Sequence, residues 1–523
     1  MAQPLGSVDE SGETLLKGET QKEAAALDVE KQLTSSPPVK DTTLKRSPPP
    51  SGGDNALKAL RAGSEFALIL AVIYLCDRTT PAARRSGPKY QEPKAFWGVW
   101  AVICGLALLF TIRPTSRASK PLSREQTEEW KGWMQIMFLL YHYFAEVELY
   151  NAIRVYIAAY VWMTGYGNLL YYQKTGNFGV VRVAQTLFRL NFFVVFICIA
   201  LRNEFMLYYI CPMHTAFTLF VWLALRLFKE GNKSPRILAV KILATLAATY
   251  CLYDVASIFR VAFGWQPLRF LLAFHDPLHP EFTDELHEWQ FRSGLDRYVW
   301  VYGMALAAGL PYLEEALGRV DRLATTHGCL AQAAARGAIA AIALAAGAYW
   351  YLNVYALQKF AYNGLHPYTS FVPITVYIVL RNLFPLLRAY YLNLFAFLGK
   401  VTLETYILQF HVWMHSTGLN GSPKSLLFIL PPDHYWLNFI LVSAFYLYLS
   451  HRVFHLTVDL KDTLVPTEPA LLYRRAAYGL AIALLFYFIG HSCQTLIRKP
   501  QDAAYNNNND NNSQQQQQQQ QQH

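Results

Sequence analysis

Ionisable side chains inside apolar segments are the residues of this 523-residue chain whose types and spacing point to chemistry. The clearest case is an apolar run that carries Lys131, His142 and Glu146. Lys131 and His142 lie about three helical turns apart, so both side chains would share one face, roughly 16 Å apart along the axis. An ionisable group deep in lipid is expensive, and we expect His142 to line a protein interior or a wet cavity. A histidine that only packs and hydrogen-bonds against a neighbouring helix is the alternative.

Further polar groups interrupt other apolar segments. Arg182 and Arg189 share a helical face, and such a pair near a membrane surface can hold a phosphorylated ligand through bidentate contacts. The alternative for a single arginine is snorkelling to lipid headgroups. Lys400, Glu404 and His411 form a second polar stripe, which would face a shared cavity or hydrogen-bond between helices. The remaining candidates for contacts with substrate or cavity are Arg154, His214, Arg292, Asp296, Arg297, Arg381 and Arg388.

Residues 275–298 mix histidines with carboxylates, a composition that metal sites also use. Pro277 breaks the helix that two of these histidines would need in order to share a face. No H-E-x-x-H or cysteine-rich pattern is present either. We therefore expect no metal, and instead a polar loop that leads into a helix on which Arg292 can pair with Asp296.

Composition assigns the chain to the membrane. Hydrophobic residues make up 53% and charged residues only 16%, whereas soluble proteins carry about 25% charged residues. Tyr and Trp gather near the ends of apolar runs, as in interfacial belts. The net charge of +10 is scattered over tails and short loops, which does not indicate nucleic-acid binding. The seven cysteines form no C-x-x-C pair, so neither a disulfide framework nor a zinc site is expected.

We expect an all-α, polytopic membrane bundle of about 10–13 spans over residues 57–497. Residues 1–56 and 498–523 are polar or of low complexity and are expected to be disordered tails. The basic amino-terminal tail favours a cytosolic amino terminus, although the next two loops are basic as well. Asn232 and Asn420 begin possible glycosylation sequons. The expected spans are 62–77, 95–112, 131–150, 152–172, 186–201, 205–228, 237–262, 297–314, 334–357, 367–386, 390–415, 435–456 and 473–496.

Several long blocks of the chain resemble one known family. The blocks at 128–135, 160–168, 287–297 and 397–411 closely resemble the plant Reduced Wall Acetylation proteins. That family shares its multi-helix domain with animal sialate O-acetyltransferase and fungal capsule O-acetylation proteins. The resemblance covers residues 57–496 and implies a Golgi membrane protein that acetylates polysaccharide hydroxyls, with acetyl-CoA as donor.

A more distant resemblance concerns the first polar stripe. Lys131 and His142 resemble the pattern of an arginine, ten residues and a histidine in bacterial acyltransferase family three, with lysine in place of arginine. The resemblance implies that His142 is a general base or carries a transient acetyl group, with Glu146 orienting its imidazole. Lys131, Arg182 and Arg189 would hold the phosphates of acetyl-CoA, which is a substrate and not a bound cofactor.

The animal and fungal relatives differ from this chain in one respect. They carry a luminal esterase-like domain with a Gly-Asp-Ser motif, which this sequence lacks. The acceptor is therefore expected to be a polysaccharide hydroxyl or a luminal acetyltransferase partner. No G-x-S-x-G, Walker or G-x-G-x-x-G motif supports a hydrolase or a nucleotide-driven pump. A transporter of acetyl-CoA or another acetyl donor, or a scaffold for luminal enzymes, are the alternatives.

Overall fold

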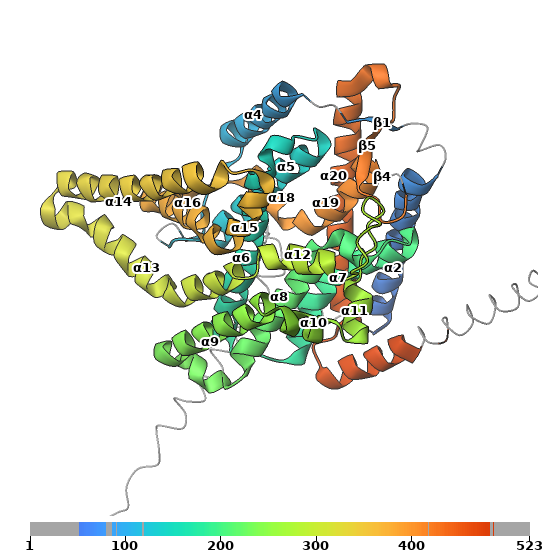
Figure 1. The fold of residues 1–523 in the computed structure, drawn as a ribbon, viewed down its shortest axis with the longest axis horizontal. Coiled ribbons are helices and arrows are strands. Elements are labelled where there is room, and N and C mark those ends of the chain that lie inside the picture. Colours follow the sequence, from blue (N-terminus) through green and yellow to red (C-terminus); the bar gives the residue numbers. More distant parts are fainter. Residues whose placement is uncertain are drawn as a thin grey trace, which may run out of the picture. The chain divides into compact units, whose positions relative to one another are not determined.

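Figure 1 shows the computed structural model, which describes residues 52–79, 86–89, 92–117, 120–416, 418–481 and 485. The described part is mostly helical, which confirms the predicted class. Residues up to Lys461 form one compact unit that holds every candidate residue, and the residues from Asp462 form another. The predicted tails and most of the expected span 473–496 lie outside the described residues, except that helix α2 (Gly52–Arg78) already begins within the first tail.

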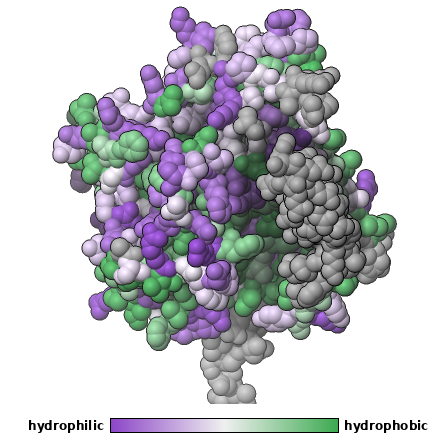
Figure 2. Space-filling view, turned by 45° about the vertical axis from the view of Figure 1, so that its right-hand side comes forward, coloured by the Kyte–Doolittle hydropathy of each residue, from purple (hydrophilic) through white to green (hydrophobic). Residues whose placement is uncertain are grey.

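Six helical segments of the described residues are long and apolar enough to cross a membrane. Their large apolar side chains are often exposed, as at Leu109 (77%) and Ile342 (71%), and Figure 2 shows apolar patches between hydrophilic ones on one face. Such exposure suits contact with lipid. The segments are Leu57–Arg78 in α2, α4 (Pro93–Phe110), α7 (Val180–Leu201), α9 (Pro235–Asp254), Cys329–Tyr355 in α14 (Cys329–Trp350) and η4 (Tyr351–Tyr355), and Pro432–Leu464 in η6 (Pro432–His434) and α20 (Tyr435–Leu464).

The remaining helices are shorter or more polar. Long ones are α5 (Arg124–Tyr143), α6 (Tyr150–Thr175), α8 (Ile210–Arg226), α13 (Val299–His327) and α16 (Phe371–Leu383). Short ones are η1 (Val147–Leu149), η2 (Phe205–Tyr208), η3 (Lys229–Lys233), α10 (Ala256–Phe263), α11 (Gln266–Leu272), α12 (His287–Leu295), α15 (Lys359–Thr369), α17 (Pro385–Ala389), α18 (Asn393–Lys400), α19 (Thr402–Leu408) and the π-helix η5 (Gln409–Trp413).

Two small antiparallel sheets join loops at the helix ends. One has the order β1-β5-β4, from β1 (Ser86–Pro88), β5 (Pro423–Leu427) and β4 (Met414–Ser416). Ser86 faces Leu427 in its register. The other pairs β2 (Ile112–Pro114) with β3 (Tyr390–Leu392). Each sheet ties together segments that are distant in sequence.

Several expected spans are wrong in their bounds. The segment 131–150 is not one helix, because α5 ends at Tyr143 and Ala145 adopts a left-handed backbone with φ of 51°. The segment 390–415 is broken into β3, α18, α19 and η5. The segment 237–262 is divided between two helices at Val255, and the segment 367–386 is divided among three helices at Ser370 and Phe384. Hydropathy alone does not register these breaks, since the apolar composition continues through them.

Close glycine contacts hold the central helices together. A Cβ at Gly132 of α5 would collide with the Phe395 carbonyl of α18, and one at Gly165 of α6 would collide with the Trp300 carbonyl of α13. Small residues let helix backbones approach closely where lipid gives no hydrophobic driving force. Twelve of the twenty α5 residues are buried, so α5 lies at the centre of the described bundle.

The chain alternates between two ends of this bundle. At one end, Arg78 donates hydrogen bonds to the carbonyls of Leu201 and Gly418, and Lys89 donates to the carbonyl of His142. We call this the His142 end. The other end holds the start of α5, the β2–β3 pair and the bond from the Thr115 amide to the Ala389 carbonyl, and we call it the Lys131 end. The central helix α5 therefore connects the two ends.

Candidate acyl-transfer site

His142 lies in the last turn of α5, at the His142 end. Its half-buried ring is surrounded by aromatic side chains, with ring centroids 4.6 Å from Phe138, 5.0 Å from Tyr141 and 6.3 Å from Phe410. Within the described residues, neither ring nitrogen has a hydrogen-bond partner. The Lys89 ammonium and the Arg292 guanidinium both act electrostatically on the ring. An imidazole that is held by packing and leaves its nitrogens free can meet a reactant.

The partners expected for His142 along its own helix are placed differently. Lys131 is on the same helix, where its ammonium pairs with Glu128 at 2.8 Å. Glu146 is buried but lies beyond the end of α5, so the expectation that it continues the helical stripe is wrong. No hydrogen bond joins Glu146 to the His142 ring among the described residues. The left-handed turn at Ala145 explains this, because it redirects the chain after Phe144.

A fully buried polar cluster lies near this end. The Arg154 Nη2 donates to the Asp296 carboxylate at 2.8 Å, and the His366 Nε2 lies 3.5 Å from the other carboxylate oxygen. The Tyr362 hydroxyl and His366 Nδ1 are 2.9 Å apart. In the part of the chain that the structure describes, Nε and Nη1 of Arg154 have no partner, although the side chain is 1% exposed. A buried guanidinium with two free donors is a place for a negatively polarised oxygen.

Arg292 is positioned by a different pair from the expected one. Its Nε donates to Glu288 at 2.7 Å, one turn earlier on α12, and its guanidinium lies 4.7 Å from the Tyr209 ring centroid. The expected pair with Asp296 is wrong, because α12 ends at Leu295 and Asp296 turns toward Arg154. The two arginines both act electrostatically on Tyr141, the neighbour of His142 in sequence.

A second buried chain of polar groups surrounds His411. Its Nε2 is 2.5 Å from the Tyr208 hydroxyl, and its Nδ1 is 3.2 Å from the Asp77 carboxylate. The Ser416 amide and hydroxyl donate to that carboxylate at 3.2 Å and 3.0 Å. Asn203 donates to the Tyr208 hydroxyl at 3.1 Å. The chain joins the end of α2 to η2 and η5, so it belongs to the His142 end.

The expected common face of Lys400, Glu404 and His411 does not exist. The helix ends at Lys400, restarts as α19 and changes to the π-helix at Gln409, which rotates each side chain to a different neighbour. Glu404 is fully buried and pairs with Arg189 at 2.5 Å, and Arg189 also donates to Thr457 at 3.0 Å. The second predicted stripe is therefore divided between two separate contacts.

The other predicted residues are dispersed. At the Lys131 end, Arg381 pairs with Glu129 at 2.7 Å, and the buried Arg388 pairs with Asp321. Elsewhere, Arg182 packs over the Tyr171 ring at 4.3 Å and the His214 Nδ1 is 2.7 Å from the Thr164 hydroxyl. Arg297 pairs with Asp254 at 2.9 Å. The structure therefore brings Arg292 to the surroundings of His142, with Arg154 nearby, and does not gather the other basic residues there.

Sequence reasoning missed several residues of these clusters. Asp77 was not singled out, although a carboxylate at the end of an apolar run is the kind of signal that marks function. Tyr208 was not selected because it lies among other aromatic residues. Nothing in the sequence indicates the contact of His366 with Asp296, since these residues come from separate segments of the chain.

A half-buried imidazole with free ring nitrogens, in a helical bundle that also holds buried guanidinium donors, is an arrangement that acyl transfer could use. Residues 17–477 match the family described as the 10 TM acyl transferase domain found in Cas1p. Because this match covers most of the sequence, the chain belongs to that family.

One curated relative is the N-acetylneuraminate (7)9-O-acetyltransferase of Danio rerio. It is 30% identical over 456 residues, which are 84% of this chain and 55% of the relative. The chain thus spans about half the length of the curated relative that it matches. No solved structure matches the chain.

Proposed function

We propose that the protein is a membrane O-acetyltransferase, which takes acetyl from acetyl-CoA at the Lys131 end and delivers it to an acceptor at the His142 end. The observation that carries this proposal is the His142 ring, half-buried and without a partner at the end of the central helix. The resemblance to plant proteins supports a Golgi membrane location and a polysaccharide hydroxyl, or a luminal acetyltransferase partner, as acceptor. The O-acetyltransferase name of the zebrafish relative supports acetyl as the group transferred.

The connection between α4 and α5 supports the proposed direction of transfer, although the connection between α2 and α4, at the His142 end, is also basic, with Arg78, Arg84, Arg85 and Lys89. The connection between α4 and α5 lies at the Lys131 end and carries Arg113, Arg117, Lys120 and Arg124. Short basic loops face the cytosol in most membrane proteins. Acetyl-CoA would therefore meet the Lys131 end, where Lys131 is partly exposed and can contact phosphate; Arg182 and Arg189 stay proposed phosphate contacts.

The cluster around Arg154 supports the chemical step. Negative charge develops on the acetyl carbonyl oxygen when a nucleophile attacks, and buried cationic donors stabilise that charge. Arg154 has two free donors, and Arg292 adds a second positive charge near His142. His142 would act as the base or carry the acetyl group. Glu146 stays a proposed orienting group, because catalytic hydrogen bonds often tighten only when substrate is bound.

Transport of acetyl-CoA without chemistry is the competing function. It can be separated from transfer with protein in sealed vesicles and acetyl-CoA labelled on both the acetyl group and the CoA. Transfer predicts a labelled ester inside the vesicles while CoA stays outside. Accumulation of both labels inside would overturn the proposal in favour of transport, and vesicles without protein provide the background.

A further inference from the structure

Tyr208, His411 and Asp77 form a second buried chain of polar side chains. All three side chains are buried, with residue exposures of 0%, 0% and 2%. An ionisable residue at depth in a membrane protein is costly and by default functional. His411 also lies in a π-helix, an irregularity that is frequent at functional sites.

The order of the three groups is that of a hydroxyl activated by an imidazole and a carboxylate. The Tyr208 hydroxyl meets Nε2 of His411 at 2.5 Å, while Nδ1 faces the Asp77 carboxylate at 3.2 Å. In this order the imidazole accepts a proton from the hydroxyl side, and the carboxylate stabilises the resulting imidazolium. Ser416 and Arg78 hold Asp77 in place from two other directions.

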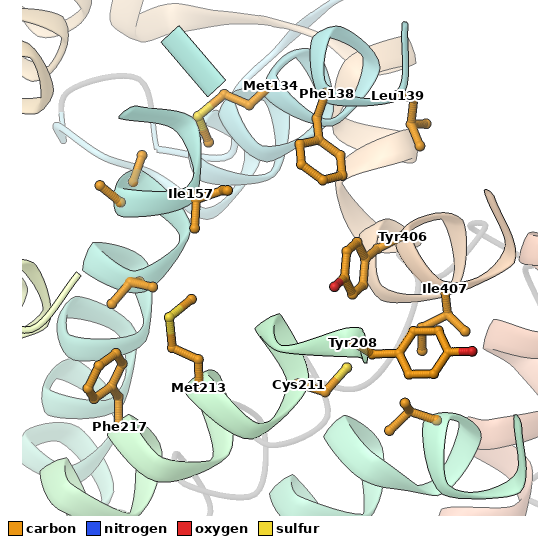
Figure 3. Close-up of a cluster of buried hydrophobic side chains, with 14 of the residues drawn as sticks. Met134, Phe138, Leu139, Ile157, Tyr208, Cys211, Met213, Phe217, Tyr406 and Ile407 are labelled. Atoms are coloured by element: carbon orange, nitrogen blue, oxygen red, sulfur yellow. The ribbon is translucent and has the colours of Figure 1, made fainter. Parts of the chain in front are cut away.

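The chain lies close to His142. Phe410 is shared, since its ring centroid is 6.3 Å from that of His142 and 5.8 Å from that of Tyr208. Figure 3 shows Tyr208 beside Ile407, with its hydroxyl directed away from Tyr406 and Phe138.

A surface cavity of about 200 Å³ lies next to this chain. Leu278, Gly418, Ser422 and Lys424 are among its lining residues. Arg78 pairs with Asp77 at 3.4 Å and donates to the Gly418 carbonyl at 2.9 Å, so Arg78 links the buried chain to the cavity wall.

We propose that Tyr208 and His411 form an acceptor-side proton relay, oriented by Asp77, for a neutral hydroxyl that enters by this cavity. The inference rests on the proposed acetyl transfer. The acceptor oxygen forms a bond to the acetyl carbon while the bond from that carbon to its leaving group, the CoA sulfur or the His142 nitrogen, breaks. The hydroxyl proton moves to the Tyr208 oxygen as the Tyr208 proton moves to His411 Nε2, and the leaving group then takes up a proton.

The test compares two small alcohols as acceptors, ethanol and its more acidic analogue trifluoroethanol, with purified protein in vesicles and labelled acetyl-CoA. A weakly acidic hydroxyl depends on a base more than an acidic one does. Tyr208→Phe and His411→Gln should lower ester formation about 100-fold or more with ethanol, and much less with trifluoroethanol. Asp77→Asn should shift the pH profile in the same assay.

The matched control is Tyr446→Phe. Tyr446 is equally buried, at 1%, and its hydroxyl donates to the Thr405 carbonyl at 2.5 Å, so this variant also loses a buried hydrogen bond. Equal losses with both alcohols in Tyr208→Phe and in Tyr446→Phe would overturn the relay while leaving acetyl transfer intact. Wild-type protein that forms no ester would overturn both the relay and the proposed function. Gel filtration shows which variants fold. If His411→Gln does not fold, Tyr208→Phe decides the outcome.

Discussion

Individual buried charges in this bundle depend on a few specific partners. Asp296 accepts from Arg154 with both side chains at most 1% exposed, so removing either group leaves an uncompensated charge in a dry interior. Breaking such a pair costs far more than the pair itself contributes, because the remaining ion keeps its desolvation penalty. The same pair of Arg154 and Asp296 holds the Arg154 guanidinium, whose Nε and Nη1 are the donors that the proposed reaction uses.

Asp296→Asn is therefore expected to lower the free energy of unfolding by about 3–5 kcal/mol. Unfolding in mixed detergent micelles measures this loss. The control is Glu315→Gln, which removes an exposed pair with Arg319 on α13 and should cost about 0–1 kcal/mol. Similar effects of the two substitutions would show that Arg154 is solvated or finds another partner.

At the scale of elements, the contact between α6 and α13 depends on backbone approach. Gly165→Ala places a methyl group against the Trp300 carbonyl, and overpacking of this kind costs about 1–3 kcal/mol. Gly167→Ala on the same helix meets nothing within 4 Å and should stabilise α6 by up to about 1 kcal/mol. Thermal unfolding in detergent compares the two, and equal midpoints would contradict the close crossing.

The loop after α11 is held by a contact between His275, which can titrate, and Glu204. His275 donates its backbone amide to Glu204 at 2.8 Å, and its ring Nδ1 lies 2.6 Å from the same carboxylate. The hydrogen bond with Glu204 and its charge raise the pKa of His275, and Glu285 lies 3.9 Å from the other ring nitrogen. Because the pKa of His275 is raised in the folded protein, the contact contributes its full stabilisation below the unfolded pKa of about 6.5. This stabilisation is lost as the pH rises through the raised pKa.

The protection factor of residues 273–286, which compares their exchange with the intrinsic rate at the same pH, should therefore be high at acidic pH and fall as the pH rises through the raised pKa of His275. The exposed position of His275 makes the change small. Glu204→Gln removes the charge partner and should make the protection factor of this loop nearly independent of pH over that range. A pH dependence that persists in this variant would assign the effect to another group.

Elements that follow apolar periodicity could be predicted from the sequence, and those set by tertiary contacts could not. The helices at 93–110 and 150–175 agree closely with the expected spans, because each is a continuous apolar run. Hydropathy gave no sign of the turn at Ala145 or of the π-helix at Gln409, since the residues around them remain apolar. The pairs of His411 with Asp77 and of Arg154 with Asp296 join segments far apart in sequence, which spacing cannot reveal.

At the scale of the molecule, the two ends should face different compartments. Lys120 lies at the Lys131 end and Leu419 at the His142 end, and both are exposed. We expect Lys120→Cys to react with a membrane-impermeant thiol reagent from the cytosolic side of sealed vesicles, and Leu419→Cys only after permeabilisation. The background has its seven cysteines replaced by alanine. Labelling of both positions from one side would contradict the alternation between two ends.

The two glycosylation sequons lie at opposite ends of the bundle. Asn420 lies at the His142 end, where it accepts from the Glu204 amide at 2.7 Å, and Asn232 lies beyond α8, where it donates to the Leu225 carbonyl at 2.8 Å. Since α8 runs away from the His142 end, the two asparagines belong to opposite ends. At most one sequon can face the lumen.

The most direct test of the account is the effect of His142→Gln on acetyl transfer. Wild-type protein and this variant, matched for folded amount by gel filtration, are reconstituted in vesicles with labelled acetyl-CoA and cell-wall polysaccharide, and the labelled ester is counted. We predict a loss of about 100-fold or more, because a group that moves a proton or carries the acetyl contributes at least that much. If His142→Gln were as active as the wild-type protein, this would contradict the central claim that acetyl transfer takes place at the His142 ring.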